Sequence, residues 1–202
     1  HNSLFLELLE DFISKVEVFG LYFATLDIRQ DSSVHTKLLH ETAAKTSALP
    51  KNFISLSEKE KIKIISKISV TADASAFTEE TIKDASNITK AIKKIQQKNG
   101  EEACNRYIIS HCTCALNVME VYGLLLMAGW KKDSMHIDIV PLFETIEDLK
   151  NAAEIMTFLY TDKNYGRHLK QRKNQQTIML GFSDGSKDGG YLMGNGSIYK
   201  AK

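Results

Sequence analysis

The sequence predicts a helix-rich α/β protein with a parallel sheet of about four strands. Residues 137–143 and 177–182 form two apolar, strand-like runs, and the helical segment between them begins with Thr145 and Asp148, a pair typical of a capping box. Two more strand-like runs precede these, each followed by helical patterns. Because strands that alternate with helices usually pair in parallel, this order indicates a doubly wound sheet or part of a barrel.

Three segments differ in character along the chain. Residues 1–37 hold an amphipathic helix followed by a strand-like run at 21–29. Residues 38–100 are lysine-rich, helical in pattern and free of strand signals, so we expect a helical insertion there. Residues 101–202 contain three expected βα units, of which the first begins with a strand at 106–110.

The last two expected helices differ in the strength of their signal. The helix between the final two strands carries apolar residues at helical spacing: Leu149, Ala152, Ala153, Met156 and Leu159. A polar connection follows it. The last helix is expected from about Ser186, although Gly189, Gly190, Gly194 and Gly196 lower its intrinsic propensity.

Composition and charge argue against several classes of protein. Lys plus Arg (26) nearly balances Asp plus Glu (25), so no net field favours nucleic acid or an anionic membrane. No run approaches the roughly 20 apolar residues of a membrane span, and no signal peptide pattern is present. The three cysteines form neither an even disulfide framework nor a zinc motif. We therefore expect a soluble, cytoplasmic protein with reduced thiols.

Two acids stand at the ends of the last two expected strands. Glu144 follows the first run and Asp184 the second. In parallel α/β proteins these strand ends form the face where active sites are built, and carboxylate oxygens are the ligands that Mg²⁺ or Mn²⁺ prefers. Glu144 and Asp184 are therefore candidate metal ligands. The alternative for Glu144 is a favourable interaction with the positive end of the helix that follows it.

Two cations accompany these acids. Arg29 ends the first expected strand and Lys187 lies three residues after Asp184. Both are candidates for binding a phosphate or carboxylate, Arg in bidentate fashion and Lys as a point charge. The alternative is structural pairing, of Arg29 with Asp27 or another acid and of Lys187 with Asp184 or Asp188.

Two histidines and two apolar residues complete the candidate set. We expect His35 to be a hydrogen-bonding residue at a helix start and His111 to be a core residue at a strand end. Leu142 and Met179 lie near the acids in sequence. They either pack in the core or form the dry wall of a pocket.

Most of the candidate residues lie in three sequence motifs: LDIRQDSSVH at 26–35, VPLFETIEDL at 140–149 and GFSDGSKDGG at 181–190. In this order and separation they resemble phosphoenolpyruvate carboxylase. The resemblance implies an α/β (TIM-like) barrel elaborated by helices, of which residues 1–202 supply a single partial barrel domain. It also implies carboxylation of phosphoenolpyruvate by bicarbonate, which gives oxaloacetate and phosphate through carboxyphosphate and an enolate.

The resemblance assigns roles by motif. Glu144 and Asp184 are similar to the two ligands of an Mg²⁺ or Mn²⁺ ion that acts as a Lewis acid. Arg29 resembles a phosphate-binding arginine, and Lys187 resembles a lysine that contacts substrate near the metal. Leu142 and Met179 resemble residues of the apolar pocket that retains carbon dioxide. Such a pocket keeps the enolate away from water protons.

The resemblance also implies missing parts. An upstream Thr-Ala-His-Pro-Thr motif and a downstream Gly-rich loop with a catalytic arginine are absent from this sequence. We expect the chain to be a central, inactive fragment of a cytoplasmic enzyme that forms a homotetramer at full length. Two alternatives are another Mg²⁺-dependent barrel enzyme acting on phosphoenolpyruvate or pyruvate, and a non-catalytic regulatory module.

Overall fold

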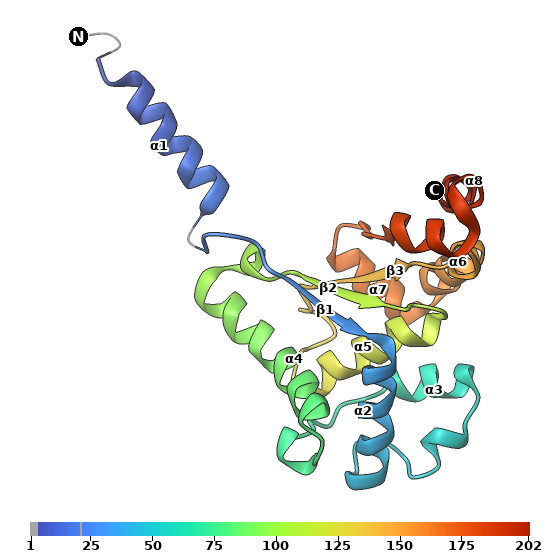
Figure 1. Cartoon of the computed structure of the whole chain (residues 1–202). Helices are drawn as coiled ribbons and strands as arrows, with labels where there is room; N and C mark the ends of the chain where they lie inside the picture. Colours follow the sequence, from blue (N-terminus) through green and yellow to red (C-terminus); the bar gives the residue numbers. More distant parts are fainter. Residues whose placement is uncertain (1–3, 21) are drawn as a thin grey trace.

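The computed structural model describes residues 4–20 and 22–202 and contains one four-stranded sheet, drawn in Figure 1. All pairings are parallel, in the order β1-β2-β3-β4. The strands are β1 (Asp27–Asp31), β2 (Arg106–Ser110), β3 (Asp138–Phe143) and β4 (Met179–Leu180). The prediction of a helix-rich α/β fold with four parallel strands is therefore confirmed. Within the described residues the sheet is open, with β1 and β4 at its edges.

Helices fill most of the remaining chain. The α-helices are α1 (Leu6–Phe19), α2 (Ser32–Lys45), α3 (Glu58–Ile65), α4 (Glu80–Asn99), α5 (Ala115–Met127), α6 (Ile146–Thr161), α7 (Lys163–Gln171) and α8 (Phe182–Ala201). Short 3₁₀ turns are η1 (Phe53–Ser55), η2 (Ala74–Ala76) and η3 (Glu101–Ala103). The expected capping box is present at Thr145 with Asp148, and a second one lies at Ser57 with Glu60. Both satisfy N–H groups that the first turn of a helix leaves unpaired.

The two faces of the sheet are unequal. Residues that pair in register share a face, so Tyr107 and Ile139 point one way while Ile108 and Val140 point the other. Tyr107 and Ile139 belong to the main apolar core, which also includes residues of α2 to α7. In Figure 1, α2, α4 and α5 lie together on one side of the strands. On the opposite face the buried apolar residues form a small cluster of Ile108, Val140 and Leu142.

Helix α1 forms as predicted, with Gly20 as its C-cap, but none of its residues is buried. Figure 1 shows it extending away from the sheet. Its apolar stripe is exposed, including Leu9, Phe12 and Val16. Leu21, the first residue of the expected strand run, lies outside the described residues. Across the described helices, none combines the length and apolar character needed to cross a bilayer.

The region after α6 differs from prediction. The expected polar connection contains α7, which Asp162 caps and which buries Tyr165, His168 and Leu169 at helical spacing. In α6 itself Ile155 is buried in place of Ala153, which is exposed. The last strand is shorter than expected because α8 begins at Phe182 rather than near Ser186.

Candidate active site at the carboxyl edge of the sheet

The Glu144 carboxylate is a buried charged group at this edge. Glu144 follows the last residue of β3 and is 6% exposed. One nitrogen of Arg29, Nη2, donates to Glu144 Oε1 at 3.0 Å, and the backbone N–H of His111 donates to Oε2 at 3.0 Å. Charge-assisted bonds of this kind compensate a carboxylate for lost water. Residues from β1, the end of β2 and the end of β3 thus meet at one side chain.

Arg29 pairs with Glu144 and not with Asp27. Asp27 Oδ1 instead accepts from Arg106 Nε at 2.7 Å, at the opposite end of β1 and β2. The Arg29 side chain is 55% exposed, whereas that of Glu144 is 8% exposed. The guanidinium therefore binds Glu144 on one side and faces solvent over much of its remaining surface.

Asp184 and Lys187 lie in the first turns of α8. Lys187 Nζ is 3.3 Å from Asp184 Oδ1, and both side chains are at least half exposed. This is the structural pairing that we considered for Lys187. No hydrogen bond or ion pair joins this pair to Glu144 among residues 4–20 and 22–202. An exposed pair of this kind is weakly held, because solvent screens it.

The backbone places the start of α8 against Glu144. The Gly181 N–H donates to the Phe143 carbonyl at 2.7 Å, and a Cβ at Gly181 would lie only 2.9 Å from the Cα of Glu144. Glycine is required here because any side chain would collide with the neighbouring backbone. Asp188 then accepts the Ile146 N–H at 3.1 Å, which ties α8 to the start of α6.

Leu142 and Met179 are direct partners in the β3–β4 register. Leu142 is buried with Ile108 and Val140, while Met179 is 37% exposed. Arg29 pairs in register with Ile108, so it shares this face of the sheet. The apolar pair and the Arg29–Glu144 pair therefore lie on the same side of the strands.

Asp31 and His111 form a pair at this edge that sequence reasoning missed. His111 Nδ1 lies 2.6 Å from Asp31 Oδ2. Burial alone would raise the pKa of Asp31, but hydrogen bonds from Ser33 and His111 outweigh it and lower that pKa to about 2. The hydrogen bond to Asp31 raises the pKa of His111.

The prediction for His111 is wrong, whereas that for His35, a hydrogen-bonding residue at a helix start, is confirmed. His111 is not a core residue, because its side chain is 65% exposed and its backbone φ is 51°. The missed signal was positional, since His111 directly follows a strand as Glu144 does. His35 does form a hydrogen bond, but inside the core, where its Nε2 is 2.9 Å from Tyr107 Oη.

The donor chemistry at this edge suits a hard divalent cation. Mg²⁺ commonly takes one or two protein carboxylates and fills its other positions with water and substrate oxygens. Glu144 and Asp184 follow adjacent parallel strands and supply such carboxylates. Larger clusters of three or more His, Cys, Asp or Glu suited to a metal are absent from the described residues.

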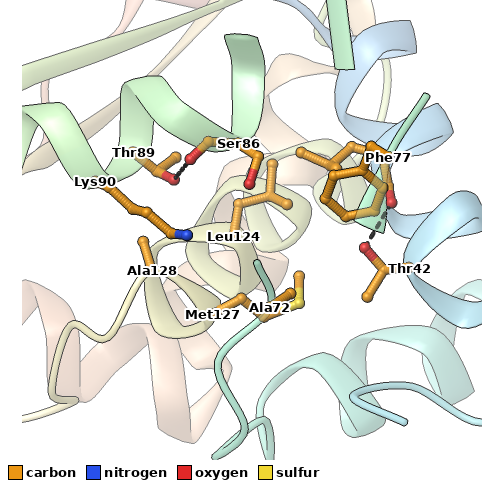
Figure 2. A pocket seen from close by; sticks show the side chains of 10 residues that line it. Thr42, Ala72, Phe77, Ser86, Thr89, Lys90, Leu124, Met127 and Ala128 are labelled. Carbon is orange, nitrogen blue, oxygen red and sulfur yellow. Dashed lines mark hydrogen bonds between the residues drawn. The ribbon is translucent and has the colours of Figure 1, made fainter. Parts of the chain in front are cut away.

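A cavity in the helical half does not compete as a substrate site. Figure 2 shows its lining, which includes Thr42 of α2, Leu124 of α5 and Phe77, the residue after η2. Its volume is about 10 Å³, roughly the space of one water molecule. A cavity of this size is a packing defect and not a binding pocket.

Comparisons with known proteins agree with one another. A family model described as phosphoenolpyruvate carboxylase matches residues 1–202. The chain is 34% identical over 203 residues to a phosphoenolpyruvate carboxylase of Nitrosomonas europaea, with 96% of this chain and 22% of the relative covered. It is 35% identical over 205 residues to a phosphoenolpyruvate carboxylase of Gloeobacter violaceus, with 96% of this chain and 21% of the relative covered. It is 32% identical over 213 residues to one of Nitrosomonas eutropha, with 100% of this chain and 22% of the relative covered. The chain thus spans about a fifth of the length of these relatives.

Proposed function

The chain belongs to the phosphoenolpyruvate carboxylase family, and on that premise we propose that it carries the metal-binding part of an active site for carboxylation. The substrates would be phosphoenolpyruvate and bicarbonate, and the products oxaloacetate and phosphate. The observation that best supports this is the arrangement around Glu144, where Arg29 and the His111 N–H bind the carboxylate and Gly181 packs against its backbone. Residues directly after β2, β3 and β4 thus contribute, together with Arg29 from the middle of β1. The carboxyl ends of the strands form the face that parallel α/β enzymes use for catalysis.

Glu144 and Asp184 are the residues we propose as ligands of Mg²⁺ or Mn²⁺. When bound, the ion would supply Lewis-acid stabilisation of the negative charge that develops on the substrate oxygen. Glu144 is the fixed ligand of the two, because two donors hold its oxygens. Asp184 is half exposed and held by a single weak contact to Lys187, so it has freedom to turn toward a cation.

Arg29 and Lys187 are the proposed substrate-binding cations. Arg29 keeps a large exposed surface beside Glu144, which suits a guanidinium that grips a phosphate with two hydrogen bonds. Lys187 is 79% exposed and supplies a mobile point charge. Leu142 and Met179 supply the apolar wall on the same face. A dry wall there would favour reaction of the enolate with carbon dioxide over protonation by water.

We also infer that the open sheet is part of a closed (β/α) barrel. One face carries the main core, whereas the other carries the small cluster of Ile108, Val140 and Leu142 with Arg29 beside it. In a closed barrel this second face would be the interior. The full-length protein would be a cytoplasmic homotetramer, and the three cysteines, which are all free, fit a reducing compartment.

The role of the acids can be tested in the full-length enzyme with Asp184→Asn and Glu144→Gln. Both changes keep the side-chain shape and remove a charge from the metal site. We expect kcat to fall by roughly 100-fold or more in each, because the lost stabilisation matters most in the transition state. Steady-state kinetics at a series of Mn²⁺ concentrations measures this, and raising Mn²⁺ should partly rescue Asp184→Asn.

Glu147→Gln is the matched control, since Glu147 is an exposed acid in the first turn of α6. It should keep the activity of the unmodified enzyme. The metal assignment fails if Asp184→Asn and Glu144→Gln behave like this control.

A further inference from the structure

We propose that Asp31 and His111 are positioning residues that hold the Glu144 carboxylate in one orientation. This inference rests on the proposed function, because it assumes that Glu144 is a metal ligand. It gives a positioning role to Asp31, which lies in the LDIRQDSSVH string, and to His111, which was expected in the core. Three observations support it: the hydrogen bond from the His111 N–H to Glu144, the left-handed backbone of His111, and the two separate contacts of the Asp31 carboxylate.

The donor to Glu144 Oε2 is a main-chain group. It is the N–H of His111, at 3.0 Å, and the His111 ring nitrogen Nε2 is farther away, at 3.9 Å. The direction of a main-chain N–H depends on the backbone conformation around it. Whatever fixes the backbone at His111 therefore also fixes one oxygen of Glu144.

The backbone at His111 is in the left-handed region, with φ at 51°. A residue with a Cβ adopts this region at an energetic cost, so other contacts must stabilise it. Two contacts from the junction of β1 and α2 do so. Asp31 holds the imidazole at 2.6 Å, and the Ser32 hydroxyl donates to the His111 carbonyl at 2.7 Å.

Asp31 has a separate contact for each of its oxygens. Oδ1 accepts the Ser33 N–H at 2.9 Å and so caps the start of α2, while Oδ2 contacts His111. The cap anchors the aspartate to a helix, and the aspartate anchors the imidazole. Because the His111 side chain is 65% exposed, core packing does not explain its position. Outer contacts of this kind orient metal ligands, and their loss typically costs 10–100-fold in metal affinity.

The test uses the full-length enzyme with Mn²⁺ as the probe. Electron paramagnetic resonance of free Mn²⁺ gives the dissociation constant without reference to activity. Asp31→Asn retains an oxygen that can cap α2 but places an amide opposite the imidazole. The variant therefore keeps the helix cap and loses the carboxylate contact to His111. We expect it to weaken Mn²⁺ binding about 10–100-fold while the enzyme remains folded.

Variants at His111 distinguish the effect of the imidazole ring from the effect of the backbone conformation. His111→Ala removes the ring and keeps the Cβ that disfavours the left-handed conformation, so we expect a similar loss of Mn²⁺ affinity. His111→Gly removes the ring but takes this conformation without cost, so the loss should be smaller. Mn²⁺ affinities within twofold of the unmodified enzyme for Asp31→Asn and His111→Ala would overturn the inference.

Glu144→Gln distinguishes this failure from failure of the proposed function. If Glu144→Gln loses Mn²⁺ binding while Asp31→Asn and His111→Ala bind normally, Glu144 is a ligand and only its positioning is wrong. If Glu144→Gln binds Mn²⁺ like the unmodified enzyme, the metal role of Glu144 falls and the positioning inference falls with it. Asp31→Asn keeps the test decisive if His111→Ala does not fold.

Discussion

Arg29 is the residue at which the structural and functional interpretations meet. It forms an ion pair with a nearly buried acid, yet more than half of its side chain is exposed. Because solvent screens the exposed guanidinium, the pair contributes little to stability, but it does orient the guanidinium. The contact fits both a structural pair with Glu144 and a phosphate-binding role for Arg29. A substitution of Arg29 that keeps the positive charge distinguishes the two roles.

Arg29→Lys keeps the positive charge and removes the planar fork. We expect the KM for phosphoenolpyruvate to rise about tenfold, equivalent to ~1.4 kcal/mol of lost binding. Added Mn²⁺ should not rescue this variant, in contrast to Asp184→Asn. Steady-state kinetics checks both statements, with Arg106→Lys as the control, because Arg106 pairs with Asp27 at the amino end of the strands. Unchanged kinetics in Arg29→Lys would leave only the structural pair with Glu144.

Helix α8 explains glycines that looked unfavourable in the sequence. Gly190 has φ 76° and breaks the helix into two halves. The halves then approach closely, since a Cβ at Gly194 would lie 3.1 Å from backbone atoms of Gly185 and Ser186. The glycines that lower intrinsic helix propensity thus permit a turn and a close crossing.

Gly194→Ala should destabilise this crossing by about 1–3 kcal/mol, because neighbouring backbone cannot move aside easily. Gly196→Ala is the matched control. Gly196 is exposed, with nothing within 4 Å of its position for a Cβ, so alanine there should be neutral or stabilise the helix by up to about 1 kcal/mol. Thermal unfolding and protease cleavage within α8 would report the difference. Equal effects of the two substitutions would show that the close crossing does not govern stability.

The molecule as a whole contains buried groups whose effects on stability oppose each other as pH changes. Burial lowers the pKa of His35 and of His168 to about 4, and each has a buried Nδ1 without a partner. Burial also raises the pKa of Glu120 to about 7, although Thr36 donates to both carboxylate oxygens. Protonation is therefore unfavourable for the folded state at the two histidines and favourable at Glu120.

We expect a net loss of stability as pH falls from about 6.5 to about 4. In this window both histidines become protonated in the unfolded chain but stay neutral in the folded one, which lowers the free energy of unfolding by roughly 3 kcal/mol for each histidine. Protonation of Glu120 in the folded chain raises the free energy of unfolding by a similar amount. Glu120→Gln removes the opposing contribution, so its Tm should fall more steeply with acid and exceed that of the unmodified protein at pH 8. A Tm that stays flat down to pH 4.5 would contradict this.

Local patterns in the sequence were enough to predict most elements and the chemistry of the edge. The capping box at Thr145 depends on contacts within a few residues, which the sequence contains in full. The strand at 106–110 is indicated by its run of strand-forming side chains, although its hydrogen bonds are to β1 and β3. The placement of Glu144 and Asp184 after adjacent strands follows from parallel pairing alone. Helix α7 was missed because its mostly polar composition masked three buried positions.

Which side chains meet could not be predicted from local patterns. Arg29 and Glu144 are 115 residues apart, and Asp31 and His111 are 80 apart, so their contacts depend on strand order and register that no local pattern encodes. The left-handed backbone of His111 likewise exists because contacts from another strand and helix hold it. Local sequence patterns therefore predict the elements and the charged groups at their ends. The fold determined their partners, since pairing across long separations is set by the packing of the whole chain.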